Sequence, residues 1–436
     1  MDALRCKHYS THVIHAMPKG NLGTIAAQRA LYKLLLDNNV DLSVSTPNPE
    51  LFKQAHPESR SMKVYRSLTP MSSMAERHVS NYLLWIIITM LRLLVFTFIA
   101  PFIRIGIIPS SMKNVIERVK KCSILMDLNL ELFRGIPISV ARELIKQKPR
   151  VLVIHKLFWS FRIFQHLWFL VIIKGVFKKK LVIGPASFGP FDSLPVLIRW
   201  LTKAVLSKFV DLVLVREPYS AILLNKLGVK KYLIVADIAL LIRTEEPRDS
   251  LAPPRLVVGV APALLRCTLT REEVKRYIEA HAKCLDELAT QYEIVFIPST
   301  PEDAIMSKMI MARMKNNQRV KIIVTNNLDK YEFLIKNLKL LITTRMHPSI
   351  IAARNFIPFA SVIYDHKQLG LLQQLGLRKF SLYINEISYD KLRLLVNGII
   401  QNHDKIRETL QSTISKLRND LSLKLFYSIH ALIDDG

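Results

Sequence analysis

The sequence has few acidic residues and few cysteines, and it lacks several motifs that would assign a chemistry at once. Its 436 residues include 35 acidic and 62 basic side chains, a formal charge of +27 that calls for anionic partners such as nucleic acid, an anionic lipid surface or a phosphorylated substrate. The four cysteines are scattered, with no C-x-x-C pair and no signal peptide ahead of them, so we expect a reducing cytoplasm and no disulfides. There is no D-x-D sequence, which argues against a metal-dependent glycosyltransferase.

Other site signatures also fail. No aromatic-and-basic module of a nucleic-acid binder occurs, so nucleic acid is not expected as a partner. His8, His12 and His15 are spaced like metal ligands, but no carboxylate or cysteine accompanies them, and we interpret them as ordinary histidines. The turn at 184–190 (GPASFGP) has neither a nucleophile elbow nor a P-loop. We therefore expect no metal and no cofactor.

The chain is nevertheless that of a folded protein, with 50% hydrophobic and 22% charged residues, and its strands and helices alternate. Such alternation predicts an α/β protein with doubly wound parallel sheets. The charged, proline-rich stretch 243–255 predicts a linker, after which the alternation restarts. We predict strands at 13–17, 123–128, 151–155, 180–185, 212–216 and 233–237, then at 256–260, 293–298, 320–324, 338–342 and 357–363.

These patterns predict two Rossmann-like domains facing a cleft, with substrate between them. The N-terminal, acceptor-side domain would span 1–245, with an apolar insertion at about 80–108. The C-terminal, donor-side domain would span 256–388, and a helical tail would follow at 389–436.

Two apolar stretches bear on localisation. Residues 82–103 are almost wholly apolar and about long enough to span a bilayer, but Arg92 interrupts them. An oblique or half-inserted helix, from which Arg92 and Arg104 reach the interface, is an alternative to a true span, and a buried core helix is a third. We interpret 157–177 as an amphipathic crossover helix. The expected location is the cytoplasmic face of the cell membrane, with a peripheral, monotopic or single-pass attachment.

The strongest functional signal lies at 343–348 (TTRMHP) and 364–367 (YDHK). The apolar run 338–342 predicts a buried strand, Pro348 suits the first turn of a helix, and Arg345 and His347 stand at the junction. The next strand delivers Lys367 to the same edge of the sheet, where open α/β folds bind ligands. A helix N-terminus with cations around it favours an anion.

Several motifs in register resemble those of a known family. In chain order they are 20–24 (GNLGT), 184–191 (GPASFGPF), 216–220 (REPYS), 227–229 (LGV), Asp237, 345–347 (RMH) and 364–367 (YDHK). Over about residues 20–380 the chain resembles the polysaccharide pyruvyl transferase family. It departs from the family pattern in the N-terminal half, at Thr24 and at 127–131 (DLNLE), which leaves open a divergent member with another transfer activity.

The resemblance implies a GT-B-like architecture. It also implies transfer of the enolpyruvyl unit of phosphoenolpyruvate onto a pair of sugar hydroxyls of a surface or lipid-linked glycan. Such chemistry needs a proton for the methylene carbon, cations for carboxylate and phosphate, and help in deprotonating a hydroxyl. The expected roles are His347 as acid, Asp237 as base or orienting residue, Arg345, Arg216 and Lys367 as donor-binding cations, and Asn21 and Ser187 in acceptor-side loops.

Two other functions stay open at this point. A GT-B glycosyltransferase could use Arg345, His347 and Lys367 to bind a nucleotide-sugar diphosphate. A nonenzymatic membrane-surface scaffold could carry a vestigial site. Structural roles for the same residues are also open: Asp237 as a helix cap, Arg216 as a salt-bridge residue and His347 as a packed core histidine.

Overall fold

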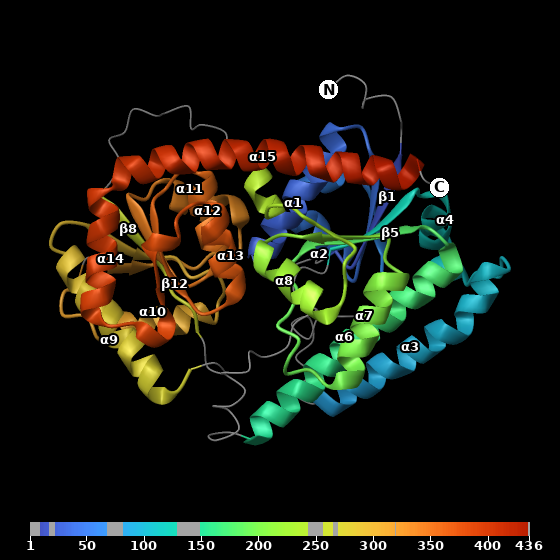
Figure 1. The fold of residues 1–436 in the computed structure, drawn as a ribbon, viewed down its shortest axis with the longest axis horizontal. Helices are drawn as coiled ribbons and strands as arrows, with labels where there is room; N and C mark the ends of the chain where they lie inside the picture. Colours follow the sequence, from blue (N-terminus) through green and yellow to red (C-terminus); the bar gives the residue numbers. More distant parts are fainter. Residues whose placement is uncertain are drawn as a thin grey trace. The chain divides into compact units, whose positions relative to one another are not determined.

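A computed structural model describes residues 9–16, 22–67, 82–128, 149–242, 256–264, 269–318 and 320–434. The chain divides into two compact units, each of which contains one parallel sheet (Figure 1). The first unit consists of Met1–Gly20, Gln28–Val235 and Ser422–Gly436, and the second of Asn21–Ala27 and Ala236–Leu421.

The first sheet has seven strands in the order β3-β2-β1-β4-β5-β6-β7, all parallel. The chain winds outward from β1 through β2 and β3, then returns to the other side of β1 as β4, so the topological switch point lies between β1 and β4. The strands are β1 (Ser10–Ile14), β2 (Asp41–Thr46), β3 (Lys63–Arg66), β4 (Ile124–Asp127), β5 (Lys180–Ala186), β6 (Leu212–Val215) and β7 (Tyr232–Ile234).

Helices bury the faces of this sheet, and its inner strands β4 to β6 are almost wholly apolar, as expected for strands covered on both sides. The helices here are α1 (Leu22–Asp37), α2 (Pro49–Ala55), α3 (Tyr82–Arg104), α4 (Lys113–Lys121), α6 (Pro149–Phe177), α7 (Val196–Lys208) and α8 (Pro218–Leu227), with 3₁₀ turns η2 (Pro57–Ser61) and η4 (Ser110–Met112). The REPYS and LGV motifs have local structural roles in α8: Glu217 caps its N-terminus through Ser220, and Gly228 ends it with φ of 87°.

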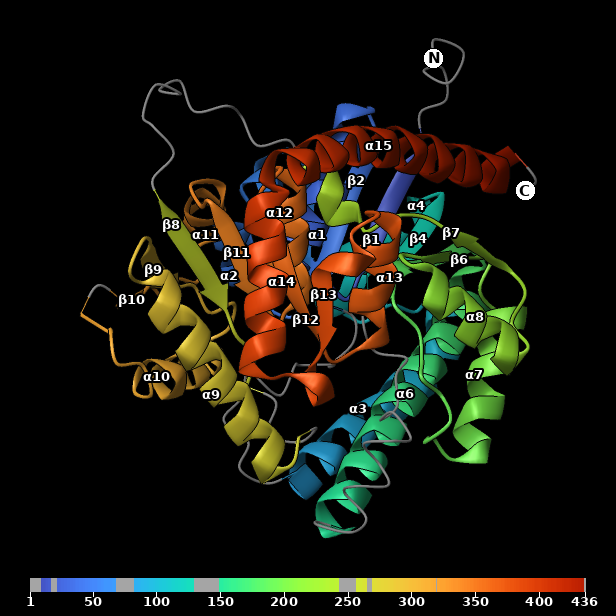
Figure 2. The same cartoon turned by 60° about the vertical axis from the view of Figure 1, so that its left-hand side comes forward.

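The second sheet has six parallel strands in the order β10-β9-β8-β11-β12-β13, with its switch point between β8 and β11 (Figure 2). The strands are β8 (Val257–Ala261), β9 (Glu293–Phe296), β10 (Val320–Ile322), β11 (Leu340–Thr343), β12 (Phe359–Ile363) and β13 (Ser381–Tyr383). The helices are η5 (Ile238–Leu241), α9 (Arg271–Leu288), α10 (Asp303–Met311), α11 (Leu328–Lys336), α12 (Met346–Arg354), α13 (His366–Gln374), η6 (Arg378–Phe380), η7 (Ile384–Glu386), α14 (Tyr389–Gln401) and α15 (His403–Asp434). A capping box of Thr270 and Glu273 begins α9.

The α/β class with two doubly wound parallel sheets is confirmed, but one predicted strand is wrong. Residues 151–155 (VLVIH) lie inside α6, because this short apolar run continues into the apolar segment that follows and forms one 29-residue helix with it. The strands β2, β3 and β13 were not predicted. The compact units also differ from the predicted linear domains, since Ala236–Ile242 groups with the second unit and α1 and α15 each have residues in both units.

The two apolar segments form long helices that lie side by side, α3 on α6 (Figure 1). The inner face of α3 packs on α6 through Phe96, whose ring centroid lies 5.8 Å from that of Phe169, and the Trp168 indole donates a hydrogen bond to Thr97. The opposite face of α3 is an exposed apolar stripe, which we call the outer stripe: Ile87, Leu91, Leu94, Val95, Phe98 and Phe102. Only 28% of the segment Ile87–Arg104 of α3 is buried, whereas 50% of Lys156–Phe177 of α6 is buried. By length and composition, both helices could cross a membrane.

Candidate active site

The predicted donor-binding residues of the second unit lie where β11 ends, at the sheet's switch point. Arg345 is the N-cap residue of α12, and its backbone N–H donates to the Thr343 hydroxyl at 3.0 Å. Its guanidinium donates from Nε and Nη2 to the two carboxylate oxygens of Asp303, at 2.9 and 2.6 Å. Burial acts to lower the pKa of Arg345, but hydrogen bonds and charge from Asp303 and Tyr364 hold it above its usual value. Arg345 is therefore a fixed cation, and this fork uses two of its five N–H donors.

His347 is the second residue of α12 and is 9% exposed. Its ring fills the space beside Gly23, the glycine of α1 and a member of the GNLGT motif. A Cβ atom added to Gly23 would lie 1.8 Å from Cγ of His347 and 2.3 Å from its Nδ1. No side chain fits between them, so only glycine at this position leaves room for the imidazole.

Lys367 lies in the first turn of α13, after β12, and is 5% exposed. Its Nζ is 3.7 Å from an oxygen of Asp365, the N-cap residue that also accepts the Lys367 backbone N–H. The next residue, Gln368, donates from its amide to the Thr344 carbonyl at 3.1 Å, which ties the start of α13 to the end of β11. The RMH and YDHK motifs therefore lie at neighbouring strand ends, as the sequence predicted.

Asp237 also belongs to the second unit, where it is 2% exposed and caps η5 by accepting the Ala239 N–H at 3.0 Å. The turn η5 packs on α12, and the buried Arg354 donates to the Ala239 carbonyl at 2.9 Å. The observed contact of Asp237 is thus a capping bond, and its role as a base stays a prediction.

The remaining predicted site residues belong to the first unit or lie outside the described ranges. Arg216, buried at the end of β6, donates from Nε to the Ser187 hydroxyl at 2.6 Å, so the structure brings these two residues together. The Ser220 hydroxyl bonds to both backbone groups of Phe188, which fixes the GPASFGPF turn against the start of α8. Asn21 lies outside the described residues.

Two site residues escaped the sequence analysis. Asp303, fully buried at the start of α10, orients Arg345 and also accepts the Leu264 N–H at 2.8 Å. Tyr277 bonds through its hydroxyl to the Thr344 hydroxyl at 2.6 Å, and burial raises its pKa. The signal for Asp303 was an acidic residue soon after strand β9, at the sheet edge where Arg345 was expected.

The arrangement provides two cations and an imidazole at one sheet edge, at the N-termini of α12 and α13. A guanidinium can bind a carboxylate or phosphate through paired N–H groups, and an ammonium adds a point charge. The helix N-terminal dipoles favour the same negative charge. Chemically, this edge can bind a small anion with two charged groups and present an imidazole to it.

The structure defines an α/β protein with two Rossmann-like sheets and an anion-binding edge on the second. Residues 152–366, just under half of the chain, match the family described as polysaccharide pyruvyl transferase, which confirms the resemblance seen in the motifs. The chain is 26% identical over 267 residues to the amylovoran biosynthesis protein AmsJ of Erwinia amylovora, a match that covers 55% of this chain and 63% of that protein. The chain is accordingly similar to a protein of amylovoran biosynthesis, of which it spans less than two thirds.

Solved structures share the fold across nearly the whole chain at low identity. The putative UDP-N-acetylglucosamine 2-epimerase of Listeria monocytogenes matches with a TM-score of 0.58 and 11% identity, over 99% of this chain and 98% of that one. Anabaena Alr3699/HepE, solved in complex with UDP-glucose, matches with a TM-score of 0.56 and 11% identity, over 98% of this chain and all of that one. These likenesses confirm the GT-B-like fold.

Proposed function

We propose that the protein is a transferase that moves the pyruvyl group of phosphoenolpyruvate onto two hydroxyls of one sugar in a surface or lipid-linked glycan. Two acceptor oxygens form bonds to C2 of the donor, the C2–O bond to phosphate breaks, and C3 takes a proton to become a methyl group. The second hydroxyl proton leaves with phosphate or solvent. The products are a pyruvate ketal and inorganic phosphate.

The observation that carries this proposal is the pairing of Arg345, held by Asp303, with Lys367 and His347 at adjoining strand ends. Phosphoenolpyruvate has a carboxylate and a phosphate on the same carbon atom, which suits a guanidinium and an ammonium at one edge. His347 would give its proton to C3. Arg216 is proposed as a further donor-binding cation, and Asp237 as the base for an acceptor hydroxyl.

A thermal-unfolding experiment tests the donor. Phosphoenolpyruvate should raise the unfolding temperature in the presence of EDTA, because a ligand at 100 times its Kd stabilises the native state by about 2.7 kcal/mol. UDP- and GDP-sugars should not. Arg345→Ala should abolish the shift, whereas Arg313→Ala, which removes an exposed arginine just after α10, should preserve it. Stabilisation by a nucleotide-sugar alone would favour the glycosyltransferase alternative.

We also propose that the protein works at the cytoplasmic face of the membrane, with the outer stripe of α3 in contact with lipid. The stripe presents more contiguous apolar side chains than a soluble surface normally carries. Arg104 at the C-terminus of α3 and the overall charge of +27 add attraction to anionic headgroups. Apolar insertion and charge should act together.

Membrane fractionation with a matched variant tests this attachment. Salt alone should not release the protein, because salt screens only its charges, whereas detergent should. Replacing Leu91, Val95 and Phe98 with glutamine should make the protein releasable by salt and leave phosphoenolpyruvate binding intact. The control replaces Val324, Phe333 and Leu394, three exposed apolar residues of the second unit, with glutamine. Like the unaltered protein, it should be released by detergent and not by salt. Recovery of the unaltered protein as soluble in low salt would contradict the proposal.

A further inference from the structure

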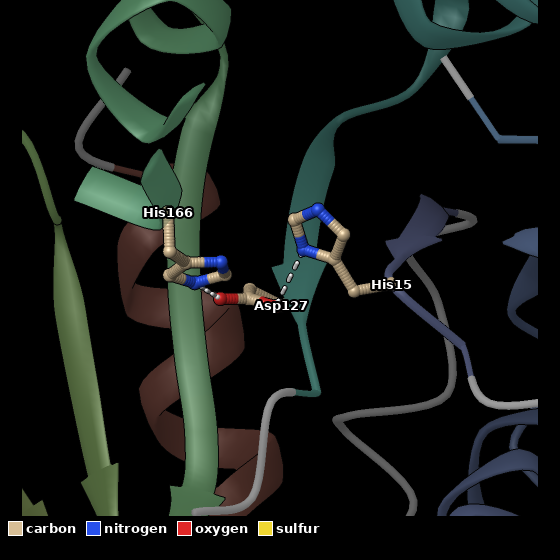
Figure 3. Close-up of side chains that lie close together, drawn as sticks. All are labelled: His15, Asp127 and His166. Carbon is tan, nitrogen blue, oxygen red and sulfur yellow. Dashed lines mark hydrogen bonds and ion pairs between the residues drawn. The ribbon is translucent and has the colours of Figure 1, made fainter. Parts of the chain in front are cut away.

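A second cluster of ionisable side chains lies in the first unit, at the switch point of its sheet. His15 follows β1 directly, Asp127 ends β4, and His166 reaches the same point from the middle of α6 (Figure 3). Because β1 and β4 are parallel neighbours, their carboxyl ends meet at one edge. The position is the one at which α/β sheets bind ligands, and neither the motifs nor the donor site uses it.

The carboxylate of Asp127 lies between the two imidazoles. Nδ1 of His15 is 3.1 Å from one oxygen, and Nε2 of His166 is 2.5 Å from the other. The Asp127 and His166 side chains are fully buried and that of His15 is 8% exposed. The rings of His15 and His166 also contact each other, with centroids 4.9 Å apart. Three potential ligand groups thus converge from three elements.

The backbone of the cluster is unusual for a structural contact. His15 has φ of 60°, a left-handed conformation that is uncommon for a residue other than glycine and that recurs at functional sites. A buried carboxylate and two imidazoles are ligand types that a divalent transition metal accepts.

We propose that His15, Asp127 and His166 bind a divalent transition-metal ion. Their potential ligand atoms all lie within 4.8 Å of one another. Ligands of a tetrahedral zinc lie about 3.3 Å apart. The His15–Asp127 contact at 3.1 Å is close to this spacing, the His166–Asp127 contact at 2.5 Å would open, and any wider pair would close by about 1.5 Å at most. Two histidines and one carboxylate leave coordination positions open, as catalytic sites do.

His12 shows why this cluster differs from an ordinary buried histidine. It lies in β1, the strand that precedes His15, but its two ring nitrogens face the Ser43 and Ser45 hydroxyls, at 2.9 and 2.7 Å. Hydroxyls make a neutral hydrogen-bonded core, whereas a buried carboxylate favours a cation. If the proposed transferase function holds, an open position on the ion would bind an acceptor hydroxyl and assist its deprotonation.

The test measures metal binding directly and needs no activity. The chelator-stripped full-length chain is titrated with Zn²⁺ by calorimetry and with Co²⁺ by visible absorption, with Mg²⁺ as an oxygen-preferring comparison. One Zn²⁺ per chain is expected, with ligand-field bands for Co²⁺ and no binding of Mg²⁺ at the same concentrations. His166→Gln and Asp127→Asn should each weaken Zn²⁺ binding by at least about 100-fold, beyond the range for loss of a residue that only orients a ligand.

His403→Gln is the matched control, because His403 and Asp404 form a His–Asp pair at 2.9 Å outside the cluster. This variant should bind Zn²⁺ as the unaltered chain does, and circular dichroism checks that each variant is folded. Absence of stoichiometric binding to the unaltered chain, or equal binding by folded cluster variants, would overturn the proposal. Phosphoenolpyruvate stabilisation in EDTA reports separately on the donor site, so the two proposals fail independently.

Discussion

The two sheets have the same kind of switch point but opposite chemistry there. At the first, between β1 and β4, a buried carboxylate lies between two imidazoles. At the second, between β8 and β11, a buried carboxylate holds an arginine, with a lysine and a histidine beside it. Strand order fixes where a ligand can bind, and the side chains at the strand ends decide its charge.

The aspartates make the contrast clear. Asp303 is paired with Arg345, so a ligand at the second switch point meets the guanidinium rather than the carboxylate, which suits an anion. Asp127 faces imidazoles instead, so the first switch point suits a cation. Two sets of substitutions test the second switch point, and a third tests buried histidines of the two units, beginning with the largest effect.

Substitutions at the second switch point should separate proton transfer from anion binding. His347→Gln should lower turnover by about 10²- to 10⁴-fold, the range for loss of a general acid, with little change in the Kd of phosphoenolpyruvate. Arg345→Ala should weaken donor binding by about 10- to 100-fold as well, because a charge-assisted hydrogen bond is worth about 1.5–3 kcal/mol. Equilibrium binding and steady-state kinetics measure both, and equal loss of binding in the two variants would make His347 a binding residue.

Gly23→Ala should displace the His347 ring, since the new methyl would lie 1.8 Å from its Cγ. Turnover should fall by roughly 10- to 100-fold while donor binding is kept, because a misplacement of about 1 Å can cost 100-fold in rate. Gly398→Ala is the control: Gly398 lies inside α14 with nothing within 4 Å of an added Cβ, and alanine there should raise stability by about 0.5–1 kcal/mol. Unchanged turnover in Gly23→Ala would show that the ring position is not needed.

Lower pH should destabilise both units through buried histidines that stay neutral. Burial, with a contribution from Arg118, lowers the pKa of His12 to about 3, and burial lowers that of His281 to about 4. Below about pH 6.5 these histidines bind protons in the unfolded chain but stay neutral in the folded chain. The free energy of unfolding therefore falls as the pH falls towards their lowered pKa values. Each histidine should cost up to about 2 kcal/mol between pH 6.5 and 5.

Urea unfolding at pH 7.5 and 5 measures this dependence. His281→Gln should reduce the slope of stability against pH, because glutamine does not titrate. If His281→Gln leaves the slope of stability against pH unchanged, His281 does not cause the loss of stability at low pH.

The sequence was informative wherever the structure is local. The run before Arg345 predicted strand β11 and the helix after it, and the neighbouring motif predicted Lys367 at the same edge. Two features could not be predicted from the sequence. Residues 151–155 have the composition of a strand, and only their continuation into α6 makes them helical. Interactions across the sheet were also hidden, because Asp303 precedes Arg345 by 42 positions and Asp127 follows His15 by 112.

The His15 example shows the physical limit well. The spacing of His8, His12 and His15 drew attention to local partners, yet His12 binds serines of β2 and His15 binds an aspartate of β4. Which side chains meet at a sheet edge depends on strand order and register, and these are set by the packing of the whole sheet. A motif search within one strand cannot supply them.

The packing of α3 on α6 determines how far Asp127 would lie from lipid in contact with the outer stripe. Lipid touching the outer stripe would be separated from Asp127 by the thickness of α3 and α6, because α6 carries His166 on the sheet and α3 packs on α6. Helices pack with axes 8–10 Å apart, so the separation would be roughly 20 Å. A lipid-linked glycan would then have to present a sugar several units beyond its lipid anchor. The diameters of two helices would then determine the minimum number of sugar units in the acceptor.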